Sequence, residues 1–243
     1  MIARLLVVAA AVGLGYLLWW PVPVAPVAWN APENPGYRGD FLPNTALAGV
    51  ERLDIAATHG PEALALGPDG LLYTSSHEGW IVRYDPVADN SERWVNTGGR
   101  PLGLAFDGEG TLLVADAYLG LLGIAPGGEL TVLSDRVNGA PIRYADDVDV
   151  APDGRVYFSD ASSKFGARAW GGTYEASLLD MMEHGGHGRL LVYDPADGST
   201  DVVLDGLQFA NGVAVSADGS FVLVNETASY RITRLWLAGE RAG

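Results

Sequence analysis

The chain has 243 residues, of which 48% are hydrophobic and 32 are glycine; it contains no cysteine and carries a formal net charge of −15. The lack of cysteine excludes disulfides, a thiolate nucleophile and zinc–thiolate sites. The negative charge argues against nucleic acid or an anionic lipid surface as a partner of the chain as a whole. The length and the many glycines suit one large all-β domain rich in turns.

The N-terminal segment predicts a membrane-spanning helix over residues 1–20. Leu5 to Trp20 carries no charge and would span about 24 Å as a helix, while Arg4 precedes it and Trp19 lies near its end. This order favours an uncleaved anchor that leaves the rest of the chain on the non-cytoplasmic side, periplasmic or extracellular. The alternative is a cleaved signal peptide and a secreted protein.

Residues 21–44 contain repeated prolines and predict a stiff, extended stalk. Such a stalk would hold the folded part of the chain off the bilayer. Residues 45–243 form the predicted β-propeller domain, and within it the apolar residues of 45–58 favour an N-terminal strand that could close the propeller from outside.

The repeat that defines the propeller is a short apolar strand, an Asp-Gly or similar turn, and a second apolar strand. Its turn glycines are spaced 40, 44 and 65 residues apart, and they are Gly70, Gly110, Gly154 and Gly219. Repeats of about 40 residues with four short strands are typical of propeller blades. The chain therefore predicts three complete blades and most of a fourth, which we interpret as about four blades of a six-bladed architecture.

The position eight residues before each turn glycine predicts the functional site. Glu62, Leu102, Asp146 and Asn211 occupy it, each where an innermost strand would begin at the mouth of the central channel. Three of the four offer side-chain oxygen, and oxygen ligands that converge on an axis suit Ca²⁺. Glu62, Asp146 and Asn211 are therefore the predicted metal ligands, and a purely structural hydrogen-bond network is the alternative.

Other polar residues are predicted to have structural roles. The carboxylates that end second strands are expected to make hydrogen bonds near the same rim, and they are Asp116, Asp160 and Glu226. The carboxylates that precede turn glycines are expected to stabilise those turns, and they are Asp69, Asp153 and Asp218. The histidines show no metal-binding spacing, and His184 and His187 are expected to face solvent or belong to a lid.

The long third interval contains an insertion between Ser162 and Gly188. Residues 176–184 predict a short helix, with an apolar face made of Leu178, Leu179, Met181 and Met182. The helix would emerge on the same rim as Asp146. It could be a lid over the channel mouth or a loop packed on neighbouring blades.

Several motifs together resemble the strictosidine synthase-like family, most closely its membrane-anchored subgroup typified by adipocyte plasma membrane-associated protein. The motifs are Tyr144-Ala145-Asp146-Asp147-Val148-Asp149, Phe158-Ser159-Asp160-Ala161, His187-Gly188-Arg189-Leu190-Leu191, Phe209-Ala210-Asn211-Gly212-Val213 and Glu226-Thr227. The resemblance implies a six-bladed propeller of the gluconolactonase and paraoxonase superfamily with calcium in the central channel. It implies that Glu62 and Asn211 are ligands, whereas Asp146-Asp147 departs from the Asn-Asp of those relatives.

The combined interpretation is a membrane-anchored, calcium-dependent hydrolase of small esters or lactones, with Asp147 as the candidate base. Two alternatives stay open. One is amine–aldehyde condensation of the strictosidine synthase type, and the other is a non-enzymatic, membrane-tethered binding module. The sequence does not constrain the oligomeric state.

Overall fold

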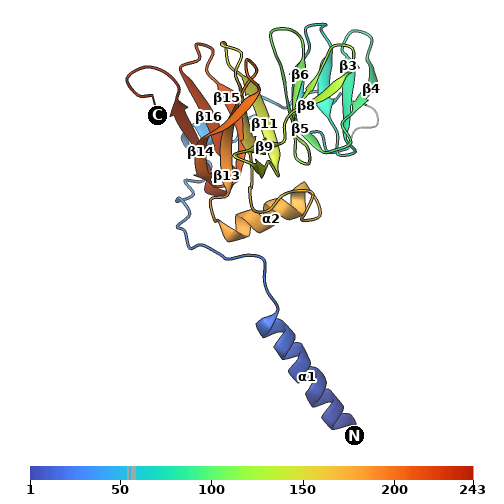
Figure 1. Ribbon diagram of the computed structural model, residues 1–243, viewed down its shortest axis with the longest axis vertical. Coiled ribbons are helices and arrows are strands. Elements are labelled where there is room, and N and C mark those ends of the chain that lie inside the picture. The colour runs from blue at the N-terminus through green and yellow to red at the C-terminus, as the bar shows by residue number, and fades with distance from the viewer. Residues whose placement is uncertain (54, 56–58, 243) are drawn as a thin grey trace.

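The computed structural model in Figure 1 describes residues 1–53, 55 and 59–242. Helix α1 (Ile2–Trp19) stands apart from the body, and none of its residues is buried. It is long and apolar enough to cross a membrane, with a mean hydropathy of 2.0. A signal sequence would pass the same test, so the helix fits both alternatives for the N-terminus.

The body consists of antiparallel sheets in which consecutive strands are neighbours. The first sheet contains β1 (Leu64–Leu66), β2 (Leu72–Ser75), β3 (Trp80–Asp85) and β4 (Asn90–Asn96). The second contains β5 (Pro101–Phe106), β6 (Leu112–Asp116), β7 (Gly120–Ile124) and β8 (Leu130–Ser134). A two-stranded ribbon follows, β9 (Arg136–Val137) and β10 (Ala140–Pro141).

The third sheet contains β11 (Ala145–Val150), β12 (Val156–Asp160), β13 (Gly188–Asp194) and β14 (Ser199–Leu207). The fourth contains β15 (Ala210–Val215), β16 (Phe221–Glu226) and β17 (Arg231–Trp236). Short 3₁₀ helices occupy Gly39–Phe41 and Thr227–Ser229, and the insertion forms α2 (Thr173–Glu183). Three four-stranded sheets and a three-stranded fourth sheet therefore follow in the predicted order.

The turn glycines explain why these repeats form hairpins. All four have positive φ, from 68° at Gly219 to 87° at Gly110 and Gly154, a conformation that glycine adopts without steric cost. The preceding aspartates accept turn N–H groups as predicted: Asp69 from Leu71 at 3.1 Å, Asp153 from Arg155 at 3.1 Å and Asp218 from Ser220 at 3.0 Å. These turns lie at the rim opposite the starts of the inner strands, which we call the far rim.

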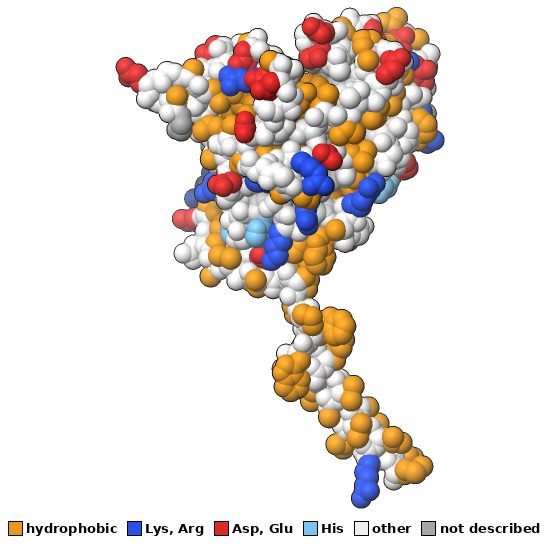
Figure 2. All heavy atoms as spheres, viewed as in Figure 1, with side chains coloured by type: hydrophobic (Ala, Val, Ile, Leu, Met, Phe, Trp, Pro, Cys, Tyr) orange, Lys and Arg blue, Asp and Glu red, His pale blue; other side chains and the backbone are white. Residues whose placement is uncertain are grey.

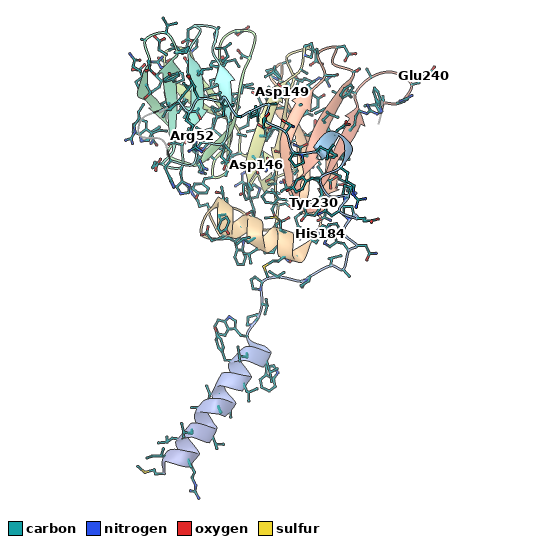
Figure 3. All side chains as sticks on the ribbon, turned by 180° about the vertical axis from the view of Figure 1, so that it is seen from behind. Arg52, Asp146, Asp149, His184, Tyr230 and Glu240 are labelled. Carbon is teal, nitrogen blue, oxygen red and sulfur yellow. The ribbon has the colours of Figure 1, made fainter. Side chains whose placement is uncertain are left out.

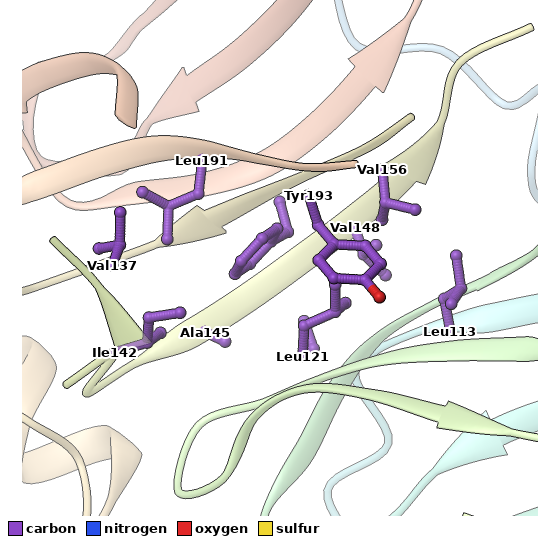
Figure 4. Close-up of a cluster of buried hydrophobic side chains, with 11 residues drawn as sticks. Leu113, Leu121, Val137, Ile142, Ala145, Val148, Val156, Leu191 and Tyr193 are labelled. Atoms are coloured by element: carbon purple, nitrogen blue, oxygen red, sulfur yellow. The ribbon is translucent and has the colours of Figure 1, made fainter. Parts of the chain in front are cut away.

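The core lies between sheets rather than within any one of them. The cluster in Figure 4 joins the second and third sheets through side chains such as Leu121 of β7, Val148 of β11 and Leu191 of β13. Strands β6 and β7 are buried along their whole length because sheets pack on both of their faces. Sheets stacked in chain order around inner strands are the arrangement of propeller blades.

The N-terminal segment differs from its prediction in two ways. The described residues of 45–58, namely 45–53 and 55, form no strand, and the remaining positions lie outside the described residues. The described part of the fourth sheet accordingly has three strands. The stalk also does not run free, because Val24 to Trp29 lies against α2 and its neighbours.

Candidate functional site

The inner strands are irregular at one equivalent place. Pairing with the second strand shifts between Pro101 and Leu104 in β5, between Ala145 and Val148 in β11, and between Ala210 and Val213 in β15. Each shift is a bulge, and a bulge bends the strand and re-aims its side chains. The residues inside the bulges are Leu102-Gly103, Asp146-Asp147 and Asn211-Gly212.

These bulges and the start of the first sheet converge on a single axial pocket of about 110 Å³. Its lining residues are Glu62, Ala63, Leu102, Gly103, Asp146, Asp147 and Asn211. The four positions predicted from the eight-residue offset therefore face a shared space. Figure 3 shows Asp146 between the sheets, on the side of the body nearer α2.

The surroundings of this pocket disfavour the ionised form of Asp146. Burial raises the pKa of Asp146 well above its usual value, and the charges of Asp147 and Glu62 raise it further. Tyr144 lies beside this group, is 3% exposed and donates its hydroxyl to the Thr173 carbonyl at 2.8 Å. Burial and the charge of Asp146 raise the pKa of Tyr144 too. A cation placed here would relieve this repulsion.

The carboxylate of Asp147 is fixed in place by a backbone hydrogen bond to the neighbouring sheet. Its Oδ2 accepts the Val213 N–H at 2.8 Å, and Asp149 accepts the Val215 N–H at 2.7 Å, so both carboxylates tie β11 to β15. Burial raises the pKa of Asp147. A Cβ added at Gly103 would lie 2.5 Å from both the Cα and the Oδ1 of Asp147, so only glycine permits this approach.

Arg100 is a site residue that the sequence did not reveal. Its side chain is 3% exposed, and its Nη2 donates to the Gly60 carbonyl at 3.1 Å and lies 3.5 Å from Glu62 Oε1. The guanidinium charge partly offsets the raised pKa of Asp146. Arg100 stands two residues before an apolar position of the repeat, so the spacing that identified the other residues gave no signal for it.

The carboxylates at the ends of second strands have the structural role predicted for them. Asp116, Asp160 and Glu226 are at most 1% exposed. Each accepts, at 2.9 Å, the N–H of the segment that leads into its inner strand, from Arg100, Tyr144 and Gln208 respectively. Asp160 also bonds Arg189 and Glu226 bonds Arg231.

Helix α2 buries a different face from the one predicted. Ala176, Asp180 and Glu183 are buried, whereas Leu178 is 40% exposed and Met182 is 67% exposed. The predicted apolar face is therefore wrong at those two positions, although Leu179 and Met181 pack against the core. The reason is that the rim below offers polar partners.

Those partners are well defined. Asp180 accepts the Ser162 hydroxyl at 2.6 Å, and Glu183 accepts Lys164 Nζ at 2.7 Å. Because α2 contributes no residue to the axial pocket, it covers the rim beside the pocket rather than the pocket itself.

Of the two histidines after α2, which were expected to face solvent or to belong to a lid, His184 does not face solvent, whereas the His187 side chain is 24% exposed. His184 is 7% exposed and stacks on Trp29 with ring centroids 4.2 Å apart, and burial lowers its pKa. His187 lies with Nε2 2.6 Å from Glu183 Oε1. His184 therefore belongs to the contact between stalk and body.

The donor set of the pocket suits a hard cation. Among the residues that the structure describes, no group of three or more His, Cys, Asp or Glu side chains is placed to hold a metal ion. The pocket instead offers carboxylates of Glu62 and Asp146 together with the Asn211 amide, and mixed carboxylate and carbonyl oxygens are ligands of Ca²⁺. The raised pKa of Asp146, caused first by burial and then by Asp147 and Glu62, agrees with this chemistry.

Comparisons with known proteins agree with the fold and the motifs. A profile described as strictosidine synthase matches residues 146–240, and one described as strictosidine synthase-like, N-terminal, matches residues 39–84. Strictosidine synthase-like protein 4 of Arabidopsis thaliana is 38% identical over 207 residues, which is 83% of this chain and 54% of that protein. Adipocyte plasma membrane-associated protein of Rattus norvegicus is 34% identical over 246 residues, 95% of this chain and 63% of that protein.

Solved structures place the fold among propellers. A putative gluconolactonase aligns with a TM-score of 0.64 at 22% identity, covering 80% of this chain and 66% of its own. Regucalcin from Agrobacterium tumefaciens, described as a calcium-binding protein, aligns with a TM-score of 0.58 at 16% identity, covering 78% and 58%. The chain spans about half the length of the first curated relatives it matches. With two matching profiles, relatives at 34–39% identity and a propeller fold, the chain belongs to the strictosidine synthase-like family.

Proposed function

We propose that this chain is a calcium-dependent hydrolase of small esters or lactones, held at a membrane by α1. The observation that carries the proposal is the axial pocket, where Glu62, Asp146 and Asn211 present oxygen atoms to one space of about 110 Å³. Burial, Asp147 and Glu62 raise the pKa of Asp146, and a cation bound in the pocket would oppose that shift. The gluconolactonase neighbours make lactones a reasonable substrate class.

The roles follow from the contacts of each residue. Glu62, Asp146 and Asn211 would hold the ion, and Ca²⁺ takes 6–8 oxygen ligands, so backbone carbonyls, water or substrate would complete the shell. Bound calcium would supply polarisation of a substrate carbonyl. Asp147 would accept a proton from water, with its carboxylate oriented by the Val213 N–H on Oδ2 and by the Val148 N–H.

Arg100 would tune this pocket. Its guanidinium lies 3.5 Å from Glu62 Oε1, so it limits how far that carboxylate can turn and reduces the net negative charge around Asp146. A buried guanidinium can also orient an oxyanion by directional hydrogen bonds. We assign Arg100 a positioning role rather than a catalytic one.

The test uses the full chain in detergent or bilayer. Calcium affinity is measured by calorimetry, and hydrolysis of phenyl acetate and of an aliphatic lactone is measured with and without chelator. Glu62→Gln should weaken calcium binding and hydrolysis together, while Glu92→Gln, which removes an exposed carboxylate on β4, should change neither. Equal affinity in wild type and Glu62→Gln would sink the ligand assignment.

The family profile gives one competing activity a specific basis. The profile that matches residues 146–240 is the strictosidine synthase profile, so amine–aldehyde condensation is the second candidate. Incubation with tryptamine and an aldehyde separates it from hydrolysis. Tight calcium binding with neither reaction would favour a non-enzymatic binding module.

Helix α1 is proposed as the anchor. Its 18 residues would span about 27 Å, and Trp19 and Trp20 stand where interfacial aromatics are enriched. The propeller would lie on the non-cytoplasmic side. Carbonate extraction of membranes would separate an integral anchor from a cleaved signal peptide, because only the former stays with the lipid.

A further inference from the structure

The stalk is clasped to the end of α2 that lies nearest the membrane helix. Ala25 N–H donates to Glu183 Oε2 at 2.9 Å, and Val27 N–H donates to the Glu183 backbone carbonyl at 2.7 Å. Trp29 stacks on His184, and Val24 packs against the cluster beneath α2. Between α1 and these contacts, the stalk is free only at residues 21–23.

That free segment is short. The four Cα–Cα steps from Trp20 to Val24 span at most about 14 Å when fully extended, which is little more than the 10–12 Å diameter of one helix with its side chains. The inference below rests on α1 crossing a bilayer, as proposed above. With α1 in the bilayer, the clasp holds the α2 side of the propeller at the headgroup level instead of keeping the body away from it.

The outward side of α2 carries an apolar stripe, next to the exposed Glu175 of the first turn. Tyr174, Leu178 and Met182 are 70%, 40% and 67% exposed, and their spacing of four residues puts them in one stripe along the helix. The opposite stripe, with Ala176, Asp180 and Glu183, is buried on the rim. Figure 1 shows α2 between the sheets and α1.

The charge of the body is arranged to match. The acidic turn residues of the far rim follow from the hairpin topology, and they are Asp69, Asp85, Asp89, Asp107, Glu109, Asp153, Asp194, Asp197 and Asp218. Exposed cations near α2 are Arg143 and Arg168. Figure 2 shows acidic side chains gathered at the end away from α1 and basic ones across the lower half of the body. An anionic bilayer would repel the far rim more than the rim that carries α2.

We infer that the stripe formed by Tyr174, Leu178 and Met182 inserts into the headgroup region of the bilayer that α1 spans. The clasp at Glu183 fixes its height, and the acidic far rim fixes which way the propeller faces. The axial pocket then opens on the side of the body that faces the lipid, since α2 leaves from the same rim as the starts of the inner strands.

The absence of cysteine allows a direct test on the full chain. Met182→Cys carries an environment-sensitive fluorophore on the stripe, and the matched control Val87→Cys carries it at a 94% exposed site in the turn between β3 and β4 on the far rim. Both proteins are reconstituted into vesicles of phosphatidylcholine and phosphatidylglycerol that contain brominated lipid. Circular dichroism confirms that each variant is folded.

The stripe label should shift to shorter wavelength and lose most of its emission to brominated lipid, whereas the far-rim label should keep the emission it has in buffer. Equal response of the two labels overturns the inference. A stripe label that shifts with protein concentration but ignores brominated lipid also overturns it, because a second copy of the chain then covers α2.

Flotation with the vesicles separates the two possible failures. If the chain floats but its stripe label is not quenched, α1 is an anchor and the stripe does not insert. If the chain does not float, both the anchor and the insertion of the stripe are contradicted. Hydrolysis of a soluble ester is independent of either result. Tyr174→Cys repeats the measurement at the other end of the stripe and should behave as Met182→Cys does.

Discussion

Two sets of carboxylates lie near the same rim of the body and differ in the charges around them. Burial raises the pKa of both Asp146 and Asp160, but Arg189 opposes the shift at Asp160, whereas Asp147 and Glu62 add to it at Asp146. At the ends of second strands, Asp160 and Glu226 receive backbone N–H groups and an arginine each. In the axial pocket, Asp146 has like charges as neighbours, and its pKa is raised. Residue type alone does not distinguish these sets.

The difference separates stabilising carboxylates from a functional site. Burial opposes the ionisation of Glu226, yet Arg231 and Thr233 outweigh it and lower the pKa, so this carboxylate is fully neutralised within the fold. The carboxylate of Asp146 is not neutralised in this way, and such groups cluster at binding and catalytic sites. The comparison predicts that removing a carboxylate harms folding in one set and ligand binding in the other.

The largest expected effect is at a structural carboxylate. Asp160→Ala leaves the Tyr144 N–H and the Arg189 guanidinium without their buried partner, which should lower the free energy of unfolding by about 3–5 kcal/mol. Urea denaturation measures it. Asp153→Ala is the matched control, because its ion pair with Arg155 is exposed and should contribute less than about 1 kcal/mol. Similar losses in both variants would contradict the structural role.

Calcium should stabilise the protein through the pocket carboxylates and not through the carboxylates at the ends of second strands. At a concentration of one hundred times Kd, a ligand that binds only the folded state adds about 2.7 kcal/mol. Wild type and Asp116→Asn, where that variant folds, should both show this gain in thermal unfolding, and Asp146→Asn should lose most of it. A full calcium gain in Asp146→Asn would remove this residue from the ligand set.

The pH dependence should have opposite signs at Asp146 and Glu183. Because the pKa of Asp146 is raised on folding, its charge opposes folding at neutral pH, and this cost disappears as pH falls through the raised pKa towards about 3.9. Without calcium, Asp146→Asn should therefore be more stable than wild type at pH 7, and the difference should vanish near pH 4. Urea denaturation over a pH series measures the difference in free energy of unfolding between the two proteins. A difference that stays constant with pH would contradict this account.

Glu183 gives the smaller and opposite effect. Burial opposes its ionisation, but Lys164, the Ala25 N–H and His187 lower its pKa to about 2. Its contribution is complete above about pH 4.5 and is lost as pH falls from there to about 2. Glu183→Gln should be less stable than wild type at pH 7 by about 1 kcal/mol, the scale of one unit of pKa difference, and the deficit should shrink in that acidic window.

The sequence determined the repeat and the residues at its hub. Glycines with positive φ, aspartates that bind turn N–H groups and alternating apolar strands are local features, so their spacing predicted both the sheets and the convergence of Glu62, Asp146 and Asn211. The apolar segment at the N-terminus likewise predicted α1 from its composition alone.

Only the tertiary structure decided the rest. The bulges that place Asp146 and Asn211 at the axis arise from pairing between strands. Arg100, at the start of the second sheet, contacts Glu62, at the start of the first. The buried face of α2 combines apolar Ala176 with Asp180 and Glu183, because Ser162 and Lys164 lie beneath it as polar partners, and Leu178 and Met182 are left exposed. Local periodicity records what a segment can form, whereas partners distant in sequence determine which face of it is covered.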